Sequence, residues 1–121
     1  MNQFEEILEH AQQAKSCENW QQALFHYQEA LTIRRKSPLA LLGKTECLIK
    51  SKQFNEAEKT CTSLLENHPG RPKGYIYMAT ILAALNRHDR AKEWIEKGLQ
   101  KFPDNNDLPF LIYDTPDLIS E

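Results

Sequence analysis

Apolar residues recur along this chain at the spacing of an α-helix. Ile7, Ala11 and Ala14 are separated by four and then three positions, and a similar pattern begins again at Ala23 and Tyr27. Because an α-helix turns once in about 3.6 residues, such residues share one face of the helix. The polar residues 16–19 lie between the two segments and indicate a turn. The pattern predicts two helices joined as a hairpin.

The same pattern returns twice more, at an interval of 34 residues. Two series are invariant, namely Ala23, Ala57 and Ala91, and Leu31, Leu65 and Leu99. Pro38 and Pro72 also match each other, each at the expected start of a helix, where the missing N–H of proline costs nothing. The sequence therefore predicts six helices, near residues 4–17, 20–35, 38–51, 54–67, 72–85 and 88–102.

The residue types in the repeating series predict how the helices pack. Small residues recur where the two helices of a hairpin must approach closely, and larger ones recur where successive hairpins meet. No hairpin covers its own apolar faces, so the hairpins should stack. The small series are Ala11, Thr45 and Ala79, and Ala23, Ala57 and Ala91; the large series are Trp20 and Phe54, and Tyr27, Cys61 and Ile95.

This repeat resembles the tetratricopeptide repeat family over residues 4–105. The residues that carry the resemblance are Ala23, Tyr27, Ala30, Ala57, Leu65, Pro69, Ala79, Ala91 and Pro103. The chain departs from the family where His88 replaces an aromatic residue and Gly98 an alanine. The resemblance implies an all-α fold, a right-handed superhelical α-solenoid of three helix-turn-helix hairpins. The repeats would span 4–37, 38–71 and 72–105, and residues 106–121 would form a C-terminal tail or a partial capping segment.

The resemblance also implies a binding surface. In similar proteins the first helix of each repeat lines a concave groove that takes an extended peptide or a helix. Apolar residues at Leu42, Ile49 and Ile76 fit a binding role, because a solvated face would normally be charged; the alternative is that they fill a tightly coiled array. The implied groove residues are Glu5, Leu8 and Gln12, then Leu39, Leu42, Glu46 and Ile49, and finally Lys73, Ile76, Tyr77 and Thr80.

One binding mode of the family fits poorly. Chaperone-binding members hold a C-terminal carboxylate with basic and amide residues at five groove positions. The matching residues here are Leu8, Gln12, Gly43, Lys73 and Tyr77, of which only Lys73 keeps the pattern. The groove is instead expected to be apolar with an acidic N-terminal rim, which suits an amphipathic segment of some basic character.

Charge and composition argue against several other functions. The formal net charge of -2 offers no basic face for nucleic acid. The one dense basic run, residues 34–36, is expected to stabilise a helix C-terminus. The longest nearly uninterrupted apolar stretch, residues 75–85, is too short to span a bilayer, so no membrane insertion is expected.

We find no pattern of catalytic or metal-binding residues. The four histidines are irregularly spaced, and none pairs with a cysteine at ligand spacing. Cys47 and Cys61 fall inside helices and are expected to fill the core. The odd number of cysteines, with no C-x-x-C pair, favours a reducing compartment, so we expect a cytoplasmic protein. No enzymatic activity, cofactor or metal is predicted.

The leading hypothesis is therefore a non-catalytic module that binds another protein or a peptide segment in its groove. An alternative is an N-terminal interaction or dimerisation domain of a larger, enzymatic protein. A further alternative is a homodimer, or a self-assembling array, formed through the third repeat and the tail. The apolar residues of the tail lie between Phe110 and Tyr113. They are the residues available to cover Trp94, Leu99 and Phe102 at the end of the last repeat.

Overall fold

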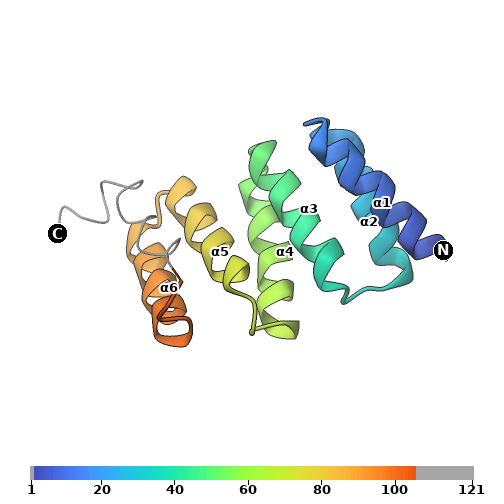
Figure 1. Cartoon of the computed structure of the whole chain (residues 1–121). Coiled ribbons are helices and arrows are strands. Elements are labelled where there is room, and N and C mark those ends of the chain that lie inside the picture. Colours follow the sequence, from blue (N-terminus) through green and yellow to red (C-terminus); the bar gives the residue numbers. More distant parts are fainter. Residues whose placement is uncertain (1, 106–121) are drawn as a thin grey trace. The chain divides into compact units, whose positions relative to one another are not determined.

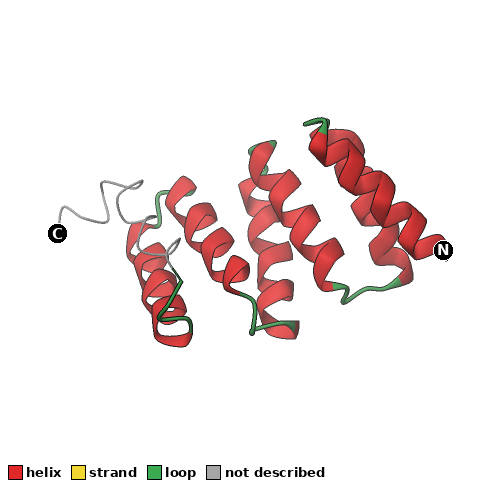
Figure 2. Ribbon diagram, viewed as in Figure 1, coloured by secondary structure: helices red, strands yellow, loops and turns green. Residues whose placement is uncertain are grey.

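The computed structural model describes residues 2–105, and these residues form α-helices joined by short turns (Figure 1, Figure 2). Each observed helix lies within two residues of its predicted bounds at either end, and residues 2–105 contain no strand. The six predicted helices are therefore confirmed. In chain order they are α1 (Gln3–Ser16), α2 (Trp20–Ile33), α3 (Pro38–Lys50), α4 (Phe54–Asn67), α5 (Pro72–Ala84) and α6 (His88–Lys101).

The turn inside each hairpin has the same backbone conformation in all three copies. Glu18, Lys52 and Asn86 all have positive φ, at 59°, 62° and 63°, and they are spaced at the repeat interval. In each case the N–H of the following residue bonds back to a carbonyl five residues earlier, at 2.8–2.9 Å, as from Asn19 to Ala14. This is the hydrogen bond of a Schellman motif, which ends a helix and reverses the chain. The repeat is thus a property of the backbone as well as of the side chains.

Polar side chains begin several of these helices. Asn2 accepts a hydrogen bond from the N–H of Glu5 at 2.8 Å, and so satisfies one of the free donors at the start of α1. Ser37 does the same for α3, because its Oγ accepts from the N–H of Ala40 at 3.3 Å, with Pro38 as the first helical residue. The helix start expected at Pro38 is confirmed, and Ser37 is its cap.

The described helices fall into two compact units, divided between His68 and Pro69. In the first unit α1 packs on α2, α2 on α3 and α3 on α4, and α1 also touches α3. In the second unit α5 packs on α6. None of the helices in residues 2–105 is long and apolar enough to cross a membrane.

Small side chains let the helices of the first unit approach closely, as the sequence predicted. Ala11, Ala23, Thr45 and Ala57 are all 0% exposed. The buried hydroxyl of Thr45 donates to the carbonyl of Leu41 at 2.7 Å, so this polar group is satisfied inside its own helix. The thiols of Cys47 and Cys61 are also fully buried, which confirms their expected place in the core.

An aromatic cluster packs between α5 and α6 in the second unit. The ring of Tyr75 lies 5.8 Å from that of Trp94 and 5.6 Å from that of Phe102, measured between centroids. Ala79 and Ala91 are 2% and 0% exposed, so α5 and α6 pack closely although the third repeat lacks the family's aromatic residue at position 88. The expectation that Phe110 and its neighbours cover this hairpin concerns residues 106–121, which lie outside the described residues.

The basic run at residues 34–36 begins just after the last turn of α2, which ends at Ile33 and contains no basic residue in that turn. Arg34 is the C-cap residue, and its guanidinium carbon lies 4.3 Å from the centroid of the Phe4 ring. This cation–π contact joins the end of α2 to the start of α1. The structure therefore gives Arg34 a packing contact that the helix-dipole interpretation did not include.

Candidate protein-binding face

In the first unit, α1 and α3 lie side by side at the front of Figure 1, and their outward side is the candidate binding face. From α1 the side chains of Glu5 and Gln12 are exposed. Leu8 is only 8% exposed, because it packs with the core of the first unit. It can therefore offer little surface to a partner.

Helix α3 carries apolar side chains on two sides. Its inner side is core, with Leu41 and Leu48 at 4% and 2% exposure. On its outer side Leu39 is 49% exposed, and Leu42 and Ile49 are half-buried. Large apolar side chains left accessible on a helix that already has a buried face mark a surface suited to an interaction.

An ion pair joins the two helices of this face. Lys15 Nζ of α1 lies 3.8 Å from Glu46 Oε2 of α3, and both side chains are partly exposed. Such a surface pair contributes about 0–1 kcal/mol, so its main effect is on local charge. Burial, followed by the charge of Glu46, raises the pKa of the neighbouring Cys47 thiol to about 11, and the charge of Lys15 opposes this rise.

Gly43, which the family resemblance placed on the groove, has no room for a side chain. A Cβ atom built on Gly43 would lie 2.1 Å from Cζ and 2.3 Å from Cε1 of Tyr27 in α2. Tyr27 itself is 1% exposed. The aromatic ring thus packs directly on the backbone of α3, which confirms that Tyr27 fills the space between successive hairpins. Gly43 serves this packing and adds no side chain to the binding face.

The other predicted groove residues belong to α5 in the second unit. Lys73 is exposed, and Ile76 and Tyr77 are half-buried. The hydroxyl of Thr80 donates to the carbonyl of Ile76 at 2.9 Å, so it is satisfied within its own helix. The eleven predicted residues are thus divided, seven on α1 and α3 of the first unit and four on α5 of the second.

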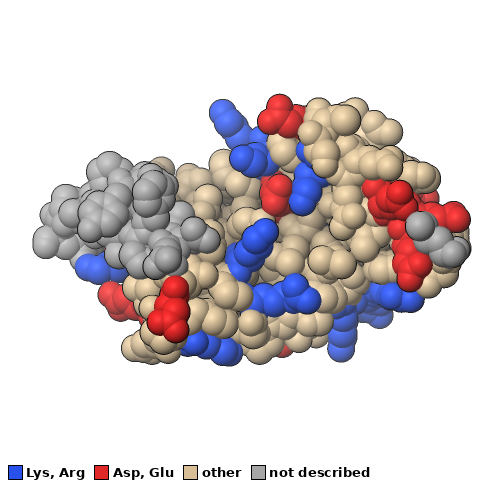
Figure 3. Space-filling view, in the orientation of Figure 1, with Lys and Arg blue, Asp and Glu red and all other residues tan. Residues whose placement is uncertain are grey.

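Acidic side chains gather at the start of α1. Glu5, Glu6 and Glu9 are all exposed, and Figure 3 shows red side chains clustered beside the N-terminus. This end of the face is therefore negative, as the sequence predicted. Because the charges are solvated, they act by attracting or repelling a partner more than by stabilising the fold.

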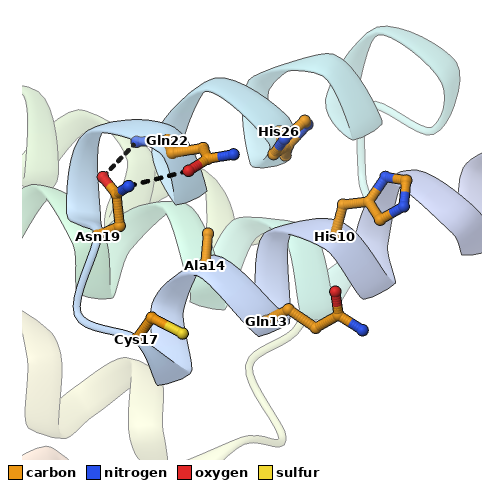
Figure 4. Close-up of a pocket in the computed structure, with 7 residues that line it drawn as sticks. All are labelled: His10, Gln13, Ala14, Cys17, Asn19, Gln22 and His26. Carbon is orange, nitrogen blue, oxygen red and sulfur yellow. Dashed lines mark hydrogen bonds between the residues drawn. The ribbon is translucent and has the colours of Figure 1, made fainter.

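A pocket on the first hairpin was missed by the sequence reasoning. It lies between α1 and α2, has a volume of about 570 Å³, and is shown in Figure 4. His10 and His26 come together there, with ring centroids 5.8 Å apart. Both residues are eight positions from the turn residue Glu18, one before it and one after, and this symmetry was the available signal. The lining residues are His10, Gln13, Ala14, Cys17, Asn19, Gln22 and His26.

A family model described as a tetratricopeptide repeat matches residues 18–74. These residues match the tetratricopeptide repeat, and the six helices of residues 2–105 fit three hairpins of that kind. The chain is also 30% identical over 86 residues to Hsp70-Hsp90 organizing protein 2 of Arabidopsis thaliana. That alignment covers 71% of this chain but only 15% of the relative, so the chain spans a small part of the relative's length.

Solved tetratricopeptide repeat domains share the fold. The first TPR of Spaghetti (RPAP3), bound to the HSP90 peptide SRMEEVD, matches with a TM-score of 0.88 at 16% identity, covering 98% of this chain and 94% of that one. The TPR2B domain of yeast Sti1, in a complex with pHsp70, matches with a TM-score of 0.87 at 21% identity, covering 94% and 96%. The predicted all-α fold of helix-turn-helix repeats is confirmed.

Proposed function

We propose that this chain is a non-catalytic adaptor that binds a segment of another protein on the first helices of its repeats. The observation that carries the proposal is the outer side of α3, where Leu39 is 49% exposed beside the half-buried Leu42 and Ile49. Similar folds in RPAP3 and Sti1 were solved with an HSP90 peptide and with pHsp70, which supports a polypeptide ligand. Lys73, Ile76, Tyr77 and Thr80 on α5 would form a binding surface of the second unit itself.

The chemistry of the first unit indicates what kind of segment it takes. Its apolar centre on α3 would bury leucine-like or aromatic side chains of the partner, at roughly 25 cal/mol per Å² of apolar surface. The exposed glutamates at the start of α1 would face basic residues. An amphipathic segment with apolar anchors and a basic end meets both requirements.

This ligand differs from the peptide bound by the RPAP3 domain, whose sequence SRMEEVD ends in acidic residues. Three of the five positions that would hold a terminal carboxylate, Leu8, Gln12 and Gly43, lie in the first unit, and none of them carries a charge. Leu8 is also almost buried, and Gly43 is covered by Tyr27. We therefore expect weak binding of SRMEEVD, with the free acid and the C-terminal amide bound equally. Fluorescence polarisation with both labelled forms tests this; a tenfold preference for the free acid would contradict it.

Substitution on α3 tests the adaptor itself. The double variant Leu39→Glu with Leu42→Glu should lose the proteins that the intact chain captures from a cell lysate. Phe25→Glu is the matched control, because Phe25 is an apolar residue of α2 that is 61% exposed outside the candidate face. Circular dichroism should show the same helix content in all three proteins. Captured proteins that are retained by the double variant would refute the proposed face.

A second candidate is an N-terminal interaction or dimerisation domain of a longer, enzymatic protein. It is favoured by the relative from Arabidopsis thaliana, of which this chain covers only 15%. The coding sequence after codon 121 tests this directly, because an immediate stop codon would exclude it.

A homodimer through the third repeat and the tail would appear in sedimentation velocity, and a monomer at high micromolar concentration would exclude that form. A cytoplasmic location is compatible with each of these candidates. We propose it on the basis of the odd number of cysteines, none of them in a C-x-x-C pair.

A further inference from the structure

The pocket between α1 and α2 brings two imidazoles from opposite helices of one hairpin to its rim. His10 is exposed, and the side chain of His26 is 19% exposed, so water and small ions reach both rings. Their centroids are 5.8 Å apart and the rings are inclined at 55°. We propose that His10 and His26 together bind a divalent first-row transition metal ion of the kind that prefers imidazole, such as Zn²⁺ or Ni²⁺.

The separation of the rings suits a shared ion. An imidazole nitrogen binds such a metal at about 2.0–2.1 Å, so two rings sharing one ion at a tetrahedral angle have centroids roughly 5.2 Å apart. The observed 5.8 Å exceeds this by about half an ångström. A small rotation of the exposed His10 side chain closes that difference without any movement of the helices.

A carboxylate contacts one ring nitrogen of His26. Nδ1 of His26 lies 3.2 Å from Oε1 of Glu29, one turn further along α2. In the neutral ring, a proton on Nδ1 that is donated to this carboxylate leaves Nε2 with a free electron pair. Histidines that bind a metal through one ring nitrogen commonly donate the N–H of the other nitrogen to a carboxylate, which orients the ring. Phe25 also contacts the His26 ring edge-on, at 5.4 Å between centroids.

The other pocket residues leave the remaining coordination positions to water. Asn19 and Gln22 are engaged with each other, because Nδ2 of Asn19 donates to Oε1 of Gln22 at 2.9 Å and the N–H of Gln22 donates to Asn19 (Figure 4). Within residues 2–105 no group of three or more His, Cys, Asp or Glu side chains is placed to hold a metal. The site therefore has two protein ligands, and its ion keeps open positions for water or for a side chain of a partner.

Such an ion would link the two helices of the first hairpin. It would bind the folded chain and not the unfolded one, because the two rings are 16 residues apart in sequence and only the hairpin brings them together. Binding should therefore raise the unfolding temperature as the ion concentration rises. This inference is independent of the proposed protein-binding face.

Titration of the full chain with Ni²⁺, without a polyhistidine tag, tests the site by calorimetry. We expect one ion per chain, and at least tenfold weaker binding in His10→Asn and in His26→Asn. His88→Asn is the matched control, because it removes a histidine from the second unit. Cys17→Ser should also bind normally, and Glu29→Ala should weaken binding about tenfold.

Nuclear magnetic resonance of the same samples locates the ion. Paramagnetic Ni²⁺ should broaden the imidazole signals of His10 and His26 before those of His68 and His88. Absence of binding at millimolar Ni²⁺, unchanged affinity in His26→Asn, or loss of binding in Cys17→Ser would each overturn the two-histidine site. Unchanged affinity in Glu29→Ala would overturn the role given to that carboxylate.

Discussion

Replacing Gly43 with alanine tests whether the ring of Tyr27 determines the residue at this position. On helix propensity alone, alanine in a helix interior is more favourable than glycine by about 0.8–1.0 kcal/mol. The added Cβ, however, would lie 2.1 Å from Cζ of Tyr27, closer than any real contact. Tyr27 is 1% exposed, so its ring has nowhere to move without shifting α2 from α3. Overpacking of this kind costs about 1–3 kcal/mol and more when backbone must move. We expect Gly43→Ala to lower the free energy of unfolding by up to about 2 kcal/mol after the propensity gain is subtracted.

Urea unfolding followed by the fluorescence of Trp20 measures this change. Trp94→Phe in all proteins removes the signal of the second unit, so that the fluorescence reports on the first unit alone. Gly70→Ala is the control, because no atom lies within 4 Å of a Cβ at that position and its φ is not positive. Because Gly70 belongs to the second unit, this variant should leave the Trp20 transition of the first unit unchanged.

A double-mutant cycle isolates the contact between Gly43 and Tyr27. Tyr27→Leu removes the ring atoms that the new Cβ would meet, and in that background Gly43→Ala should become neutral or stabilising. The steric role of the Tyr27 ring is refuted if Gly43→Ala stabilises the otherwise unchanged chain by the amount that helix propensity predicts. It is also refuted if the alanine costs the same with and without the ring.

Three further predictions rest on burial and capping. In the native chain only Cys17 should react with iodoacetamide at pH 8. Cys47 and Cys61 are fully buried, and burial raises their pKa values to about 11 and about 12. Mass spectrometry should therefore show one adduct on the native chain and three adducts after denaturation. Burial, followed by the charges of Cys47 and Glu46 themselves, raises the pKa of Tyr27 to about 12 from an unfolded value of 10.0. The folded state thus favours the protonated phenol. This contribution to stability is complete below pH 10 and is lost as the pH rises to about 12. Urea titrations at alkaline pH should show that Tyr27→Phe reduces the fall in unfolding free energy over this pH range. Ser37→Ala should lower the free energy of unfolding by about 1 kcal/mol, because the N-terminus of α3 loses its cap, while a Ser37→Asp variant that keeps a cap should not.

Local sequence was sufficient to predict the helices. A helix end depends on nearby residues: a proline at the first position, a capping serine, or a turn residue that leaves the helical region. These signals recur at the repeat interval, so each copy supported the bounds predicted for the others. The small series could be predicted as buried for the same reason, because periodicity alone identifies the face of a helix that must be covered.

The sequence predicted which positions lie on the binding face, but not how exposed each of their side chains is. Leu8 and Leu39 were both assigned to it, yet Leu8 is 8% and Leu39 49% exposed. The difference depends on how closely neighbouring helices cover each residue, which helical periodicity does not specify. Gly43 was assigned to the same face, although its backbone is covered by a ring from the preceding helix.

What the sequence by itself determined is the set of six helices, their repeat and the faces that must be buried, because these follow from contacts within one or two helical turns. Only the tertiary structure decided which side chains meet across helices. It placed Tyr27 on Gly43, Arg34 over Phe4 and His10 beside His26. Such pairs are separated by 16 to 30 residues in the sequence, and they form only when folding fixes both the register and the distance between two helices.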